Sequence, residues 1–177
     1  MTCQVGRPEP TSPFTVRPFT YEGVKITKWE ISLKDGGLAQ LKLTVDGQQE
    51  LTATALATAS FLASSATFPF TQGTIKLGGT PTTASGETTI ASGVPLATVA
   101  KSITITGDNS LATDRYGIGN AGQKKEQLQN GLQTLMVKLD SEFSKAELYD
   151  LYVAGTPTPI QFDLTGAVIG GGNNFLF

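Results

Sequence analysis

Residues 24 to 46, VKITKWEISLKDGGLAQLKLTVD, decide the fold class. Apolar residues alternate with polar ones from Trp29 to Leu33 and again from Ala39 to Val45. Between these runs, residues 34 to 37, Lys-Asp-Gly-Gly, are of the types that form tight turns. Because period-two alternation places every second side chain on one face of a strand, this stretch predicts an antiparallel hairpin with one apolar face.

The same alternation returns further along the chain and predicts more strands. The predicted strands cover residues 74 to 77, 99 to 106, 132 to 140 and 158 to 165. Residues 52 to 60 alternate small apolar with hydroxyl side chains, so a thin strand competes there with a short alanine-rich helix, and we favour the strand. The predicted fold class is therefore mainly β: an antiparallel β-sandwich or a barrel-like fold with one short α-helix.

The single helix is predicted from its boundary signals. Ser144 precedes Glu147 by three residues, which is the spacing of a capping box, and Phe143 stands where it would pack on Leu148. Gly155 then predicts the end of the helix near Ala154. We expect a helix that starts at Ser144.

Three segments lack these patterns. Residues 1 to 20 carry Pro8, Pro10, Pro13 and Pro18, which predict an extended arm outside any central strand. Residues 80 to 95 contain almost no large apolar side chain and predict a mobile loop. The apolar end Phe175-Leu176-Phe177 predicts a strand that needs a partner. We treat residues 1 to 177 as one domain that lacks flanking segments of a longer protein.

Composition excludes several function classes. Thirteen Lys and Arg balance fifteen Asp and Glu, so no basic excess is available to neutralise nucleic-acid phosphates. The chain has no His, the commonest general base near neutral pH, and only one cysteine, Cys3. Residues 117 to 122 match G-x-G-x-x-G but do not follow a buried strand, so they read as a glycine-rich loop. We predict no catalytic residue, cofactor, metal ligand or membrane insertion.

Two groups of charged residues remain as candidates for contacts. Arg115, Lys124 and Lys125 form a local basic patch beside Tyr116, which suits a phosphate site, a contact between subunits or a solvated loop. In the hairpin, the side chains that alternate away from the apolar face predict a lumen-facing or solvent-facing surface. Those hairpin residues are Glu30, Lys42 and Asp46.

A series of short motifs runs through most of the chain in a fixed order. In order, they are residues 4 to 8 (QVGRP), 18 to 23 (PFTYEG), 25 to 30 (KITKWE), 45 to 47 (VDG), 73 to 79 (GTIKLGG), 108 to 111 (DNSL), 130 to 132 (NGL), 148 to 152 (LYDLY) and 154 to 156 (AGT). In this order the motifs resemble the tail tube, or major tail, proteins of long-tailed bacteriophages, in particular an actinophage-like group.

The resemblance implies a structural virion protein and no enzyme. It implies hexameric rings that stack into the tail tube and conduct the genome into the host, with assembly in the host cytoplasm. The implied partners are further copies of the chain, the tape measure, tail terminator and distal tail proteins, and genomic DNA in transient, non-specific contact. The alternatives are a glycan- or receptor-binding β-sandwich module of a virion or cell surface and, third, an enzyme.

We expect contacts between subunits at several places that the sequence leaves without a partner. These places are the N-terminal arm of residues 1 to 20, the turn of the central hairpin at residues 34 to 37, the basic patch and the apolar end of the chain. The candidate contact residues are Asp35, Gly36, Arg115, Lys124, Lys125, Phe175 and Phe177.

Overall fold

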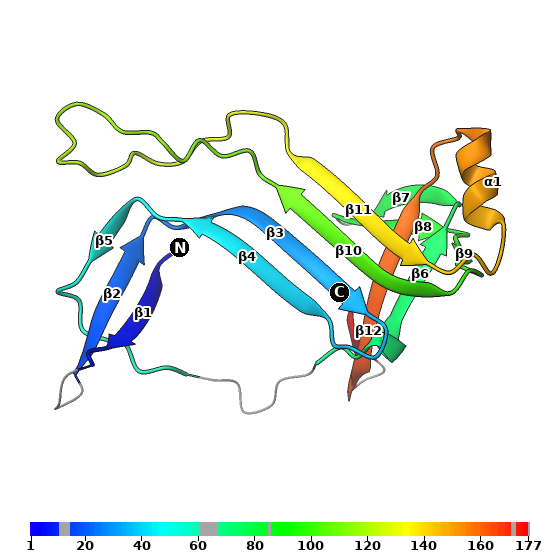
Figure 1. The fold of residues 1–177 in the computed structure, drawn as a ribbon, viewed down its shortest axis with the longest axis horizontal. Coiled ribbons are helices and arrows are strands. Elements are labelled where there is room, and N and C mark those ends of the chain that lie inside the picture. Colours follow the sequence, from blue (N-terminus) through cyan, green and yellow to red (C-terminus); the bar gives the residue numbers. More distant parts are fainter. Residues whose placement is uncertain (11–14, 61–66, 85, 171–172, 177) are drawn as a thin grey trace. The chain divides into compact units, whose positions relative to one another are not determined.

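A computed structural model describes residues 1–10, 15–60, 67–84, 86–170 and 173–176 (Figure 1). Residues in strands outnumber residues in helices severalfold. The antiparallel sheets do not close into a barrel. The predicted mainly-β class with one short helix is therefore confirmed.

The described strands form three larger sheets and one isolated hairpin. One sheet has the order β1 (Cys3–Pro8), β2 (Val16–Glu22), β5 (Gln49–Leu51). The second, which we call the central sheet, has the order β11 (Thr134–Ser141), β10 (Ala100–Asp108), β3 (Lys25–Lys34), β4 (Gln40–Asp46). The third has the order β13 (Asn173–Leu176), β12 (Ile160–Gly170), β6 (Gly73–Leu77), β9 (Val94–Pro95). The hairpin pairs β7 (Thr80–Ala84) with β8 (Glu87–Ala91), and the helical elements are η1 (Phe70–Gln72) and α1 (Glu147–Ala154).

The chain divides into two compact units. The first unit contains Met1–Glu30, Leu41–Ala63 and Thr106–Met136, and the second contains Ile31–Gln40, Ser64–Ile105 and Val137–Phe177. All four strands of the central sheet supply residues to both units. The assignment of residues 1 to 177 to a single domain stays a prediction.

The central hairpin folds as the alternation predicts. Gly36 has a φ of +74°, a conformation that glycine adopts without strain, and the backbone N–H of Gly37 donates to the carbonyl of Lys34 at 2.9 Å. The turn is held further by the backbone N–H of Asp35, which donates to the carbonyl of Lys101 at 2.8 Å. The predicted strands at 74 to 77, 99 to 106, 132 to 140 and 158 to 165 are likewise confirmed as β6, β10, β11 and β12, with ends that differ by a few residues.

The second unit has an apolar core. Leu33, Ile103 and Leu164 are buried together, one from each of β3, β10 and β12. Partly buried apolar side chains surround them; these are Ala39, Phe68, Ile75, Ile105, Leu139 and Phe162. Burial of this kind stabilises the unit by roughly 1.5–3 kcal/mol for each fully buried aliphatic side chain.

The prediction of an N-terminal arm is wrong, because residues 3 to 8 and 16 to 22 form the hairpin β1–β2. Pro18 lies within β2, the central strand of its sheet. It is tolerated there because β5 pairs only with Thr20 to Glu22, so at Pro18 the strand has a single neighbour, β1.

Two predictions for the middle of the chain are also corrected. Residues 52 to 60 form no strand, since their small side chains give a sheet little to pack. Residues 80 to 95 are not an irregular loop but contain β7, β8 and β9. Cross-strand hydroxyl pairs stabilise this hairpin in place of apolar contacts, as between Thr83 and Thr88, whose oxygens lie 2.9 Å apart. The mobility of this segment stays a prediction.

The helix starts later than its boundary signals predict. Its N-cap is Ala146, with no side-chain cap. The two expected capping side chains bind the backbone ahead of β10 instead: Ser144 Oγ accepts from the N–H of Val99 at 3.2 Å, and Glu147 Oε1 accepts from that of Thr98 at 2.5 Å. Phe143 is 81% exposed and therefore does not pack on Leu148 as predicted. The C-terminal prediction is confirmed, because Gly155, at φ +60°, follows Ala154.

The apolar end of the chain has a strand partner within the same chain. β13 pairs antiparallel with β12, with Thr165 opposite Leu176 and Val168 opposite Asn174. The sequence predicts that the strand containing Phe175 pairs with a neighbouring subunit. This prediction is wrong for the edge of β13 that pairs with β12. Phe177 lies outside the described residues.

Candidate functional site

The two edge strands of the central sheet carry exposed apolar side chains. On β4, Leu41 is 57% exposed and Leu43 is 45% exposed; on β11, Leu135 is 66% exposed. Among the described strands, β4 has only β3 as a neighbour and β11 has only β10. Each edge therefore offers unpaired backbone groups beside apolar side chains, a combination that favours pairing with another strand.

Within each unit, one face of the central sheet carries mainly apolar side chains. Ala39, just before β4, and Leu139, on β11, both pack against the core of the second unit. Since alternate residues of a strand share a face, Leu43 and the other odd-numbered residues of β4 follow Ala39, and Val137 follows Leu139. Trp29 packs over Gly107: a Cβ placed on Gly107 would fall 2.2 Å from its ring, so Gly107 makes room for the indole.

In the first unit, the opposite face carries mainly charged and hydroxyl side chains and is hollowed. Glu30 and Lys42, two of the residues predicted to face a lumen or solvent, line the same open hollow within the first unit. The hollow also contains the ion pair between Lys28 Nζ and Asp108 Oδ2, at 2.9 Å. The hydrogen bond from Lys28, together with one from the backbone N–H of Ser110, lowers the pKa of the Asp108 carboxyl. Its charged side chains are two cations and two anions, so the hollow is balanced in charge.

Asp46, the third predicted lumen-facing residue, does not line this hollow and is half-buried. Its Oδ1 accepts from Lys124 Nζ at 2.6 Å, and its Oδ2 accepts from Gln127 Nε2 at 2.9 Å. Gln127 is only 1% exposed and also donates to the backbone carbonyl of Asp46 at 3.0 Å. We call Asp46, Lys124 and Gln127 the polar anchor. The ion pair with Asp46 raises the pKa of Lys124.

The polar anchor holds residues 109 to 133, which we call the excursion, against the end of β4. A second tie comes from Lys25 on β3, whose Nζ donates to Glu126 Oε1 at 2.7 Å and to the carbonyl of Gln127 at 2.8 Å. This ion pair lowers the pKa of Glu126. Sequence reasoning missed Gln127, because a lone amide in a polar stretch carries no periodic signal; only the contact with Asp46 identifies it.

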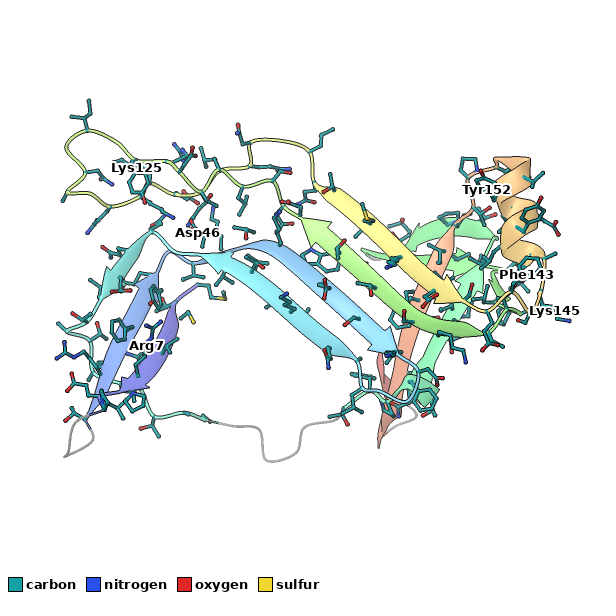
Figure 2. All side chains as sticks on the ribbon, viewed as in Figure 1. Arg7, Asp46, Lys125, Phe143, Lys145 and Tyr152 are labelled. Carbon is teal, nitrogen blue, oxygen red and sulfur yellow. The ribbon has the colours of Figure 1, made fainter. Side chains whose placement is uncertain are left out.

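The structure divides the predicted basic patch among different partners. Lys124 binds Asp46 and lies 6.0 Å from the centroid of the Tyr116 ring, and the Arg115 guanidinium donates to the carbonyl of Glu126. Lys125 is exposed, as Figure 2 shows on the excursion. The patch therefore presents one uncommitted cation rather than three, which is too few to hold a phosphate backbone tightly.

The turn residues predicted to contact a neighbour are exposed in the second unit. Gly36 has open space around it, and the Asp35 carboxylate lies 3.7 Å from Lys101 Nζ. Lys101 also binds Glu142 at 2.8 Å, and these contacts, with Glu142 the stronger, raise its pKa. Whether Asp35, Gly36, Arg115, Lys124, Lys125, Phe175 or Phe177 contacts another subunit stays a prediction.

Neither a metal site nor a membrane-spanning helix is found in the described part of the chain. Across those residues, no three His, Cys, Asp or Glu side chains gather in an arrangement that could hold a metal ion. Helix α1, the one α-helix described, is too short to cross a membrane, and no described helix meets the length and apolarity needed.

Comparison with known proteins gives one family. A search of curated proteins found no match. The family model described as phage tail tube protein matches residues 6–174, nearly the whole chain, including both edges of the central sheet and the polar anchor. Proteins of this family are structural components of phage tails in the virion. The chain belongs to the phage tail tube protein family.

Proposed function

We propose that copies of this chain associate through the edges of the central sheet into closed rings, and that the rings stack into the tube that conducts the phage genome. The observation that carries the proposal is the pair of edge strands, β4 and β11, each with exposed apolar side chains. Two different edges that meet between copies make a head-to-tail contact, which closes into a ring when the rotation fits. The resemblance to tail tube proteins implies six copies of the chain in each ring.

The polar face of the central sheet is the side that we propose to line the lumen. Glu30 and Lys42 lie there beside the Lys28–Asp108 ion pair. Because the charges balance, the face neither attracts phosphates strongly nor repels them, which suits a conduit that DNA must leave without stalling. We propose transient, non-specific DNA contact and no enzymatic activity. The other partners are the tape measure, terminator and distal tail proteins, which the chain meets during assembly in the host cytoplasm.

Ring formation is tested with two edge variants. Leu43→Lys blocks the β4 edge and Val137→Lys blocks the β11 edge, and both positions are exposed, so the subunit itself should stay folded. We expect the parent protein to give rings and tubes by electron microscopy and multimers by mass photometry, whereas each variant alone stays monomeric. Circular dichroism checks the fold of each.

A mixture of the two variants separates head-to-tail pairing from other modes of association. Each variant keeps one intact edge, so an equimolar mixture should give a dimer that cannot grow. Rings from either variant alone would contradict the proposal. A persistent parent monomer that binds a glycan array would favour the receptor-binding alternative, and one that turns over a substrate would favour an enzyme.

DNA contact is tested by fluorescence anisotropy with duplex DNA at physiological salt. We expect no binding tighter than micromolar, because the polar face is charge-balanced and the excursion has a single uncommitted lysine. Nanomolar affinity would contradict the conduit proposal.

A further inference from the structure

The two edge strands carry charges that have no partner within the described part of the chain. Lys42 on β4, and Lys138 and Asp140 on β11, are all exposed. None of these three side chains takes part in an ion pair among the described residues. These charges are therefore free to select how one edge pairs with another.

Alternation places each of the three free charges on the polar side of its own strand. Leu139 packs against the apolar core, so Lys138 and Asp140, its neighbours on β11, point to the polar face. Lys42 lines the polar hollow with Glu30. Any pairing of β4 with β11 that keeps apolar side chains together also brings these charged side chains together.

The strand directions make the contact between copies antiparallel. Figure 1 shows alternating arrows along the order β11, β10, β3, β4. With four alternating strands, β4 and β11 run in opposite senses, so a ring that repeats the sheet places β4 of one copy antiparallel to β11 of the next. Directly opposite side chains in such a pair have Cβ atoms about 4.5–5.5 Å apart and interact strongly.

Registers that keep the apolar faces together differ by two residues. One of them places Leu43 opposite Leu135 and Lys42 opposite Met136, and it gives the free charges no charged partner. Three others, each with at least four opposed pairs, place a free charge opposite another charged residue, and these charges distinguish them. The first gives the longest overlap but puts Lys42 opposite Lys138, and like charges directly opposite are destabilising. The second places Lys42 opposite Asp140, Leu43 opposite Leu139 and Val45 opposite Val137. The third shortens the overlap and pairs Lys138 with Asp46, whose carboxylate is already bound to Lys124 and Gln127.

We infer that adjacent subunits pair in the second register, with Lys42 of one copy opposite Asp140 of the next, and that this ion pair sets the register of the ring. The inference rests on the proposed function. Its partner is a second copy of this chain, and charge complementarity between the two free edges is the argument for it. The assigned contacts run from Leu41 opposite Ser141 to Asp46 opposite Met136.

Disulfide trapping reads the register directly. In a Cys3→Ser background, Leu43→Cys is combined in turn with Val137→Cys, Leu139→Cys or Ser141→Cys, which are the opposite positions in the first, second and third registers. A disulfide requires Cβ atoms about 3.5–4.5 Å apart, so only directly opposite residues qualify. Two strands separate β4 from β11 within one subunit, a gap of roughly 14 Å, so every cross-link joins two copies.

We expect the Leu139 combination to give a ladder of covalent multimers on a non-reducing gel, and the other two to stay largely monomeric. Rings are verified by electron microscopy for each sample before oxidation. Efficient cross-linking by the Val137 or Ser141 combination within intact rings would overturn the register and leave the ring proposal standing. Absence of rings in the parent would overturn the proposed function itself.

Charge reversal tests the cause of the register. Lys42→Glu faces Asp140 in the second register but faces Lys138 in the first, so we expect it to abolish the Leu139 cross-link, either by loss of rings or by transfer of the cross-link to Val137. Adding Asp140→Lys should restore the Leu139 cross-link. Lys145→Glu, an exposed lysine ahead of α1, is the matched control (Figure 2). Unchanged rings and an unchanged Leu139 cross-link in Lys42→Glu would overturn the role of the ion pair.

Discussion

The two compact units are stabilised by different interactions. In the second unit the buried side chains are mainly aliphatic and centre on Leu33, Ile103 and Leu164. In the first unit the one buried apolar side chain among the described residues is Val24, and the most buried residue is Gln127, within the polar anchor. Apolar burial tolerates small shifts, whereas a buried hydrogen-bond network requires each partner in place. The first unit should therefore depend on a few specific contacts.

The largest effect is expected in the second unit. Leu164→Ala removes a side chain that is 2% exposed and leaves a cavity, so it should lower the free energy of unfolding by about 2–5 kcal/mol. Urea denaturation measures the loss, and Val153→Ala, at an exposed position on α1, should stay within about 0.5 kcal/mol of the parent. A loss below 1 kcal/mol would mean that this core is loosely packed.

The next effect is expected in the first unit. Asp46→Ala leaves Lys124 Nζ without its acceptor and removes one of the two acceptors of Gln127 Nε2, which should cost about 1–3 kcal/mol. Amide hydrogen exchange should accelerate in the excursion, while Lys125→Ala, next to the anchor but exposed, should change little. If Asp46→Ala and Leu164→Ala accelerate exchange equally throughout the chain, the two units unfold together. The different interactions in the two units would then not make their stabilities independent.

A smaller effect is expected at the end of the helix. Gly155 has a φ of +60°, and a Cβ placed there would meet no other atom within 4 Å. Gly155→Ala should therefore cost only the backbone strain of the left-handed conformation, about 1 kcal/mol. Thermal melting measures it. Ser144→Ala is the comparison: because Ser144 does not cap α1, that change should leave the helical content by circular dichroism unaltered.

The smallest effect concerns acid pH and the first unit. Lys25 lowers the pKa of Glu126 below its unfolded value of about 4.3. Such a carboxylate contributes stability that is fully present above that value and is lost as the pH falls through the folded-state pKa. The protection of the excursion amides, which is their exchange rate relative to the intrinsic rate at each pH, should therefore fall at acid pH in the parent. Glu126→Gln should remove part of this acid dependence. An identical acid response in both proteins would contradict a contribution from the Lys25–Glu126 ion pair.

The strands that alternation predicts correctly share a local cause. From Trp29 to Leu33, around Gly36 and at Gly155, the residues that set the conformation are neighbours in sequence, so pattern and turn chemistry are sufficient. The predictions that are wrong depend on distant partners. Ser144 and Glu147 match a helix-cap pattern. Their side-chain oxygens instead accept hydrogen bonds from the backbone N–H groups of Val99 and Thr98.

The sequence by itself therefore determined the mainly-β class, the central hairpin, the end of the helix and the tail tube family, because these follow from short-range periodicity and an ordered set of motifs. Only the tertiary structure decided that the N-terminal segment pairs as β1–β2, that Asp46 is half-buried against Lys124 and Gln127, and that Glu30 and Lys42 share a hollow. The reason is physical: a side chain's partner is set by which strands lie side by side, and residue order alone does not state this.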